Sequence, residues 1–88
     1  MKQRYLEVTF RKGKPLAAYL YLPRPPGAKA ARTSDAGQGV KIDYDAREIP
    51  IGVEITAPSA ISVDELLALL ATLGIDQLDR TELAPLAA

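Results

Sequence analysis

The alternation of apolar and polar residues is strongest between residues 39 and 58, where it predicts two strands joined by a turn. One face of each strand is apolar and the other is polar, which is typical of an antiparallel pair with one side in water. Most of the apolar residues are β-branched and pack well on a pleated surface. The apolar positions are Val40, Ile42 and Tyr44 in strand 39–45, and Ile49, Ile51, Val53 and Ile55 in strand 49–56.

Three further segments carry the same alternation and are predicted as strands over residues 4–10, 16–22 and 28–34. In the first two, Phe10 and Leu16 fall among the positions that face the core. A polar turn containing glycine joins these two strands into a hairpin. A segment with three prolines then ends the second strand, because proline cannot donate a hydrogen bond to a ladder.

Residues 63–73 are predicted to form a helix, because leucines recur there on a broad apolar stripe. Ser62 and Glu65 have the spacing of a capping box, in which each side chain accepts a bond from the backbone amide of the other residue. Gly74 can adopt the left-handed conformation that ends a helix, with Ile75 packing back as in a Schellman motif.

These elements predict one α+β domain over residues 1–88, a curled antiparallel β-meander of four to five strands followed by one C-terminal helix and a short tail (75–88). One helix covers about 10 Å of a sheet that is about 20 Å wide, so the tail, sheet curling or a second subunit must cover the rest. A symmetric dimer is the commonest solution, and we expect a homodimer. The expected interface residues are Leu67, Leu70, Leu78 and Leu83.

Four segments of the chain also match a known family in the same order. They are AYLYL at 18–22, ART at 31–33, GVKIDYD at 39–45 and IGVEI at 51–55. Over roughly residues 16–58, the chain resembles the small, mainly bacterial family named domain of unknown function 2283. The resemblance implies a small antiparallel meander with a terminal helix and no assigned activity. Some members lie beside small toxin-like proteins, so the resemblance also implies an antitoxin-like role for a few of them.

The chain departs from the family pattern at the turn between the two central strands. Members usually carry glycine there, whereas this chain carries Ala46, Arg47 and Glu48. A glutamate in a left-handed conformation costs on the order of 1 kcal/mol. We therefore expect a turn of another type at this point.

The composition argues against catalysis. The chain has no histidine and no cysteine, so it lacks the commonest general base, the best nucleophile and any thiolate metal site. We expect a protein that is not an enzyme and holds no cofactor. Asp43 and Asp45 share a strand face and could bind Mg²⁺ or Ca²⁺, or could pair with cations on neighbouring strands. With no apolar run of about 18 residues and no signal-like N-terminus, we expect a cytoplasmic protein without membrane contact.

The polar faces of the predicted strands carry the residues best suited to bind a partner. Tyrosine and arginine are typical anchors at protein interfaces. Aromatic residues beside basic ones can also stack on the bases of single-stranded nucleic acid, and ordinary cross-strand pairing is a third interpretation. The candidate residues are Tyr5, Tyr19, Tyr21, Arg32 and Lys41.

The formal net charge is zero, but nine of the eleven basic residues lie in residues 1–41 and nine of the eleven acidic residues lie in residues 42–88. This split can indicate an anionic partner for the first half, or the charges can offset each other across neighbouring strands. The leading hypothesis is a non-catalytic interaction module that self-associates and binds a small protein partner, as an antitoxin does. The alternatives are nucleic-acid binding through the tyrosines and the basic first hairpin, and a weak carboxylate metal site.

Overall fold

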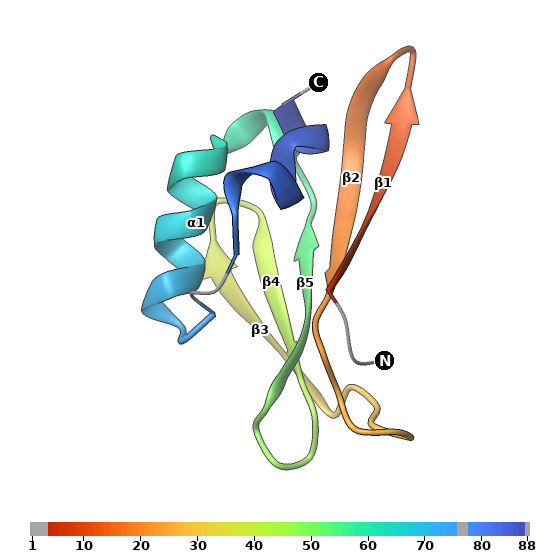
Figure 1. The fold of residues 1–88 in the computed structure, drawn as a ribbon, viewed down its shortest axis with the longest axis vertical. Coiled ribbons are helices and arrows are strands. Elements are labelled where there is room, and N and C mark those ends of the chain that lie inside the picture. The colour runs from red at the N-terminus through yellow and green to blue at the C-terminus, as the bar shows by residue number, and fades with distance from the viewer. Residues whose placement is uncertain (1–3, 76–77, 88) are drawn as a thin grey trace.

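The computed structural model describes residues 4–75 and 78–87, and this part of the chain contains five strands, one α-helix and two 3-10 helices (Figure 1). The predicted α+β class is confirmed. Residues 76, 77 and 88 of the predicted tail lie outside the described residues. The elements are β1 (Tyr5–Arg11), β2 (Lys14–Tyr21), β3 (Arg32–Gly37), β4 (Val40–Tyr44), β5 (Pro50–Ile55), η1 (Pro58–Ala60), α1 (Val63–Thr72) and η2 (Arg80–Ala87).

The five strands form one sheet in the order β1-β2-β5-β4-β3, and every neighbouring pair is antiparallel. The expected meander holds within β1–β2 and within β3–β4–β5, whereas β2 pairs with β5. Residues 22–31 carry the chain past β5 and β4 to the far edge of the sheet. The three prolines in this connection cannot donate to a ladder, which fits its lack of strand pairing, and β3 begins at Arg32 and not at the predicted residue 28.

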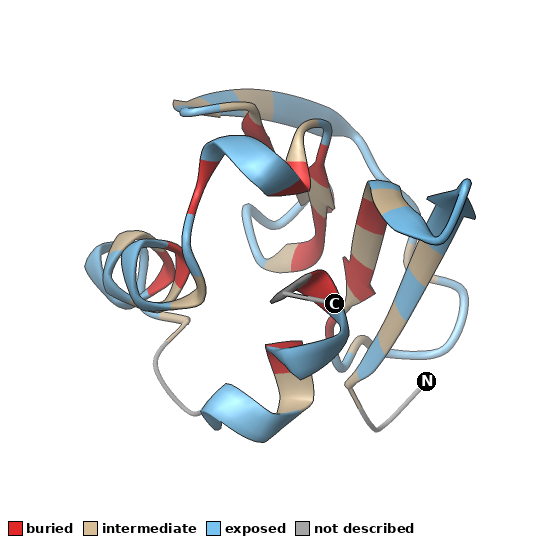
Figure 2. Ribbon diagram, turned by 90° about the horizontal axis from the view of Figure 1, so that it is seen from above, coloured by how far each residue is buried: buried red, intermediate tan, exposed pale blue. Residues whose placement is uncertain are grey.

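The hydrophobic core lies between the sheet and a second layer made by α1 and η2 (Figure 1). Figure 2 shows that the buried stretches of the strands, of α1 and of η2 face one interior. The central strands β2, β4 and β5 supply most of this core, because each has neighbours on both sides. The buried apolar residues are Ala18, Leu20, Leu22, Val40, Ile42, Ile51, Val53, Ile55, Ile61, Leu66, Leu70, Leu83 and Leu86.

Both predicted ends of α1 are confirmed. The Glu65 amide donates to Ser62 Oγ at 3.0 Å, and the Ser62 amide donates to Glu65 Oε1 at 2.9 Å. These bonds to Ser62 hold the pKa of Glu65 below its usual value. At the other end, Gly74 has a φ of 82° and the Ile75 amide donates to the Leu70 carbonyl at 2.9 Å.

No helix among the described residues has both the length and the apolar composition needed to cross a membrane.

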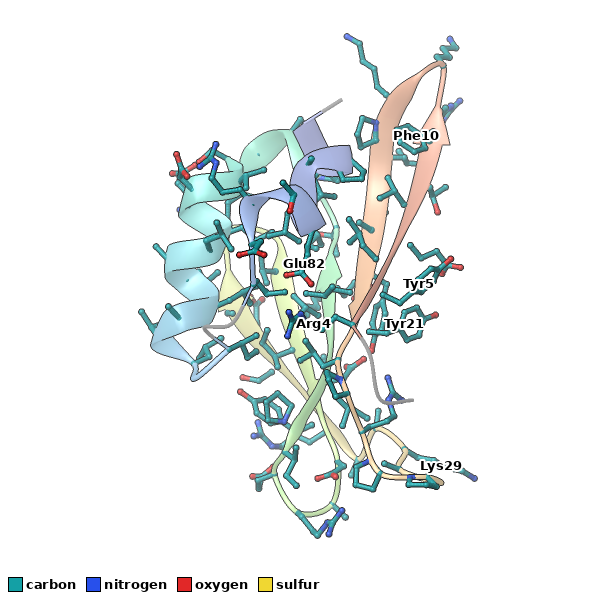
Figure 3. All side chains as sticks on the ribbon, in the orientation of Figure 1. Arg4, Tyr5, Phe10, Tyr21, Lys29 and Glu82 are labelled. Atoms are coloured by element: carbon teal, nitrogen blue, oxygen red, sulfur yellow. The ribbon has the colours of Figure 1, made fainter. Side chains whose placement is uncertain are left out.

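The tail folds back onto the sheet as η2 and covers a further part of its inner face. Leu83 and Leu86 are buried in the core, and η2 contacts α1, β1 and β2. Arg4 binds Glu82 through two hydrogen bonds, from Nε to Oε1 at 2.9 Å and from Nη2 to Oε2 at 3.2 Å (Figure 3). This pairing and a bond from the Asp79 amide hold the pKa of Glu82 below its usual value. The last element is therefore tied to the start of the first strand.

The position of the tail contradicts part of the expected dimer interface. Leu70 and Leu83 are 0% exposed within the single chain, so neither side chain can reach a second subunit. Leu67 and Leu78 are half-buried and pack against the same core. One helix does leave part of the sheet uncovered, and η2 covers some of that part with Leu83 and Leu86.

The expectation of another turn type between β4 and β5 is wrong. Glu48 adopts the left-handed conformation, with a φ of 64°. Asp45 holds this turn, because its Oδ1 accepts bonds from the amides of Arg47 at 2.8 Å and Ile49 at 3.0 Å. Each such bond contributes about 1 kcal/mol, which offsets the backbone cost of the glutamate.

Candidate functional site

The outer face of the sheet is the side turned away from α1 and η2, and it carries most of the predicted partner-binding residues. Cross-strand neighbours share a face, so the strand register defines this surface. Figure 3 shows Tyr5 and Tyr21 on the side of the β1–β2 ribbon away from α1. We call this surface the tyrosine face; its residues are Tyr5, Glu7, Tyr19, Tyr21, Thr33, Asp35, Lys41, Asp43, Gly52 and Glu54.

The three tyrosines of this face contact one another. The rings of Tyr5 and Tyr21 have centroids 5.8 Å apart, and those of Tyr19 and Tyr21 are 4.7 Å apart with a T-shaped arrangement. Such tilted and edge-on pairs contribute about 0.5–1.5 kcal/mol each beyond the area they bury. Tyr5 is 53% exposed, while Tyr19 and Tyr21 are half-buried. The result is one continuous aromatic cluster that is open to solvent at Tyr5.

Asp43 fixes the position of Tyr19 through hydrogen bonds. The Tyr19 hydroxyl donates to Asp43 Oδ2 at 2.5 Å, and the Thr33 hydroxyl donates to Asp43 Oδ1 at 2.5 Å. Bonds of this length between a hydroxyl and a carboxylate are strong. The end of the Tyr19 ring lies on the backbone of Gly52, where an added Cβ would overlap the hydroxyl oxygen. The Tyr19 ring is thus held between the Asp43 carboxylate and the backbone of Gly52, which carries no side chain.

Tyr19 is expected to stay protonated beyond the pH at which ordinary tyrosines ionise. Burial, together with the hydrogen bond and negative charge of Asp43, raises its pKa well above the usual value of about 10. The stabilisation is full below about pH 10 and is lost as the pH rises, because the unfolded chain then releases this proton more readily. Phenolate absorbance should show one tyrosine fewer titrating in the folded protein than in the unfolded protein. The Tyr19→Phe variant should abolish this difference, and an unchanged difference would contradict the assignment.

Arg24 borders the tyrosine face and was not among the predicted residues. Its Nη2 donates to the Ile51 carbonyl at 2.8 Å, and its guanidinium lies 5.9 Å from the centroid of the Tyr21 ring. Its Nε is buried without a hydrogen-bond partner among the described residues. A lone arginine between prolines carries no sequence signal that could have identified this position. Gly52 did carry a signal, since a glycine inside a strand marks a close approach of another group.

The prediction that Arg32 joins the tyrosines is wrong. Its guanidinium lies 4.3 Å from the centroid of the Tyr44 ring, and its Nε donates to Glu48 Oε2 at 3.0 Å. Arg32 pairs with Tyr44 in the register, one position away from the outer-facing Thr33. Lys41 does belong to the tyrosine face, where its cross-strand neighbours are acidic.

The two candidate metal-binding carboxylates serve separate networks. Asp43 accepts from two hydroxyls on the outer face, whereas Asp45 is buried in the β4–β5 turn and accepts from two amides. Within residues 4–75 and 78–87, no group of three acidic side chains is placed to hold a metal ion. The two carboxylates therefore accept hydrogen bonds from protein donors in two separate networks.

The charge of the tyrosine face is mixed and mainly acidic. Lys41 is its basic residue, and its acidic residues are Glu7, Asp35, Asp43 and Glu54. The acidic side chains of this face would repel a nucleic-acid backbone. Comparison of the chain with family models, curated proteins and solved structures found no match.

Proposed function

We propose that this protein is a non-catalytic interaction module that self-associates into a homodimer through the tyrosine face. The observation that supports this most directly is the contact between Tyr5, Tyr19 and Tyr21 on a sheet face that no described element covers. Tyrosine is enriched at protein interfaces, where it contributes a large apolar surface and a polar end. On the inner face, by contrast, α1 and η2 bury most of the apolar side chains.

The rigidity of the cluster also supports this proposal. Tyr19 is fixed by Asp43 and by the backbone of Gly52, and Tyr21 packs edge-on against Tyr19. Side chains that are already ordered lose little conformational entropy on association. A preorganised aromatic surface of this kind favours binding over a merely structural role.

The mixed charge of the face suits a second copy of the same chain. A twofold dimer brings one patch against itself, so the patch must be self-complementary. Lys41 and the bordering Arg24 provide cations, while Glu7 and Glu54 provide anions on the same surface. Two copies can set these opposite charges against each other, which would select the orientation of the dimer.

Sedimentation equilibrium over a range of protein concentrations tests this proposal. The mass of the wild-type protein should rise with concentration from that of one chain toward that of two. The double variant Tyr5→Ala/Tyr21→Ala should weaken association at least about tenfold, because aromatic anchors at interfaces contribute roughly 2 kcal/mol or more. Circular dichroism of the variant checks that the fold is kept.

A matched control lies on the opposite surface. Leu73 at the end of α1 is 37% exposed and lies outside the tyrosine face, so Leu73→Ser should leave the dissociation constant within about twofold. A wild-type mass that stays at one chain across all concentrations would overturn self-association. Weakening by Leu73→Ser but not by the tyrosine variant would place the interface on the helix.

Our second proposal is that the same module binds a small protein partner. Some members of the family that the chain resembles lie beside small toxin-like proteins, and the tyrosine face is the surface that such a partner would occupy. A toxin-like partner would then compete with self-association, and the mass of the mixture would show a complex of two different chains in place of the homodimer.

A further inference from the structure

The hairpin formed by β1 and β2 extends beyond the rest of the sheet. Among the described residues, the pairing of β2 with β5 covers Ala18 to Tyr21, so residues 14–17 extend past the end of that ladder. Figure 1 shows the end of the hairpin projecting away from β5. We call residues 9–17 the β1–β2 arm. The arm lies apart from the aromatic cluster of the tyrosine face, so a function of the arm does not depend on the proposed dimer.

The arm carries a concentrated positive charge. Arg11, Lys12 and Lys14 are all exposed, and residues 9–17 include no acidic residue. None of the ion pairs found among the described residues includes one of these three side chains. The arm is thus a local cationic site on a chain whose formal net charge is zero.

The tip of the arm has two features that are locally unfavourable, one in its charges and one in its backbone. Arg11 and Lys14 are direct cross-strand partners, an arrangement in which like charges repel. Lys12 occupies the left-handed conformation with a φ of 54°, followed by Gly13 at 79°, which is the two-residue turn that favours Asn-Gly. Local violations of this kind are expected at functional sites, and an anionic partner would relieve the charge repulsion.

Two apolar side chains lie directly behind the cations. Phe10 and Leu16 are each 50% exposed, although alternation predicts that both face the core. The register shifts between Thr9 and Phe10, so Phe10 pairs with Pro15 and Leu16 is left without a direct cross-strand partner on β1. Figure 3 shows Phe10 near the projecting end of the hairpin. The arm therefore presents cations at its tip and an aromatic and an aliphatic side chain behind them.

We propose that the β1–β2 arm binds nucleic acid, with Arg11, Lys12 and Lys14 on backbone phosphates and Phe10 and Leu16 against sugars or bases. A two-stranded ribbon fits the major groove of duplex DNA. Apolar side chains beside cations are also used as wedges at base steps. Nucleic acid on the arm would be a different class of partner, on a different surface, from the second copy of the chain on the tyrosine face.

The order of residues along the arm distinguishes nucleic acid from a membrane surface. Hairpins and helices that insert into lipid place apolar side chains deepest, while the cations reach back toward the headgroups. In this arm the order is reversed, because Lys12 and its basic neighbours are outermost and Phe10 and Leu16 lie behind. A tip-first approach suits a phosphate-lined groove and disfavours hydrocarbon.

Fluorescence anisotropy with a labelled DNA duplex, and with single-stranded DNA and RNA of the same length, tests the proposal. Binding should weaken with salt, with a slope of log K against log salt of about −2.7 on the duplex, which corresponds to three phosphate contacts. The triple variant Arg11→Gln/Lys12→Asn/Lys14→Gln should lose at least about tenfold in affinity. Asparagine is well suited to the left-handed position, so this variant should fold.

A second triple variant controls for overall charge. Lys29→Gln/Arg32→Gln/Arg47→Gln removes the same charge from positions outside both the arm and the tyrosine face, and should change affinity by less than about twofold. Phe10→Ala should weaken binding at every salt concentration without changing the slope. This result would separate apolar contact from phosphate contact.

Three outcomes would overturn the proposal. The first is an absence of binding to all three nucleic acids at low salt. The second is an equal loss of affinity in the two triple variants, which would show that binding depends on net charge alone and not on the arm. The third is tighter binding to vesicles of anionic phospholipid than to nucleic acid, with the same dependence on the arm.

Discussion

Replacing Leu83 by alanine is expected to lower the free energy of unfolding by about 3 kcal/mol. Leu83 is 0% exposed, and η2 places it in the core against the inner face of the sheet. The substitution removes buried methyl groups and leaves a cavity, because the surrounding strands relax only in part. Urea unfolding followed by circular dichroism measures the change.

The control for this variant is Leu73→Ala, which removes the same groups from a side chain that is 37% exposed. We expect a loss of less than about 1 kcal/mol at this position. If both variants lose the same small amount, η2 does not belong to the core, and the inner face of the sheet must be covered in another way.

Replacing Gly52 by alanine is expected to lower the free energy of unfolding by about 2 kcal/mol, because the new Cβ would displace Tyr19 from Asp43. The added methyl would overlap the Tyr19 hydroxyl oxygen and the end of its ring. The tyrosine must therefore swing away and give up a charge-assisted hydrogen bond. Thermal or urea unfolding of the variant gives the magnitude.

The Tyr19→Ala background provides the matched test of this mechanism. Removing the ring takes away the three atoms nearest to the new Cβ at position 52, whose backbone is not in the left-handed region. Alanine is favoured over glycine in a strand by about 0.5–1 kcal/mol, so Gly52→Ala should become neutral or stabilising. An equal loss in both backgrounds would show that the Tyr19 contact is not the cause.

The parts of the fold that the sequence predicts best are those with local signals. The capping box at Ser62 and the left-handed Gly74 define α1, and the structure contains both. The alternation from Val40 to Ile55 defines β4 and β5, whose inner residues are buried. These features depend on residues a few positions apart, so one sequence is enough to detect them.

The long-range pairings could not be predicted in the same way. Nothing in the local pattern indicates that β2 pairs with β5 or that β3 reaches the far edge. Alternation also continues through residues at the end of a hairpin, so it could not show that Phe10 and Leu16 stay half exposed. The spacing of Leu83 and Leu86 indicated packing, but not whether the partner was the same chain or a second one.

The residues of the candidate site could also be predicted only in part from the sequence. Alternation correctly placed Tyr5, Tyr19 and Tyr21 on the outer face, because it requires only the right strands. Arg32 was misplaced, since a difference of one residue in a strand moves a side chain to the other face. The contact of Tyr19 with Gly52 joins two strands far apart in sequence, and only the three-dimensional structure reveals it.

The most direct test of the tyrosine face as the interface is a comparison of amide chemical shifts in dilute and concentrated protein. We predict that the shifts that change with concentration cluster at Tyr5, Tyr21 and Gly52, on the face that the chain leaves open. Changes confined to Leu67 and Leu73 on α1, with the tyrosine face unaffected, would contradict this account.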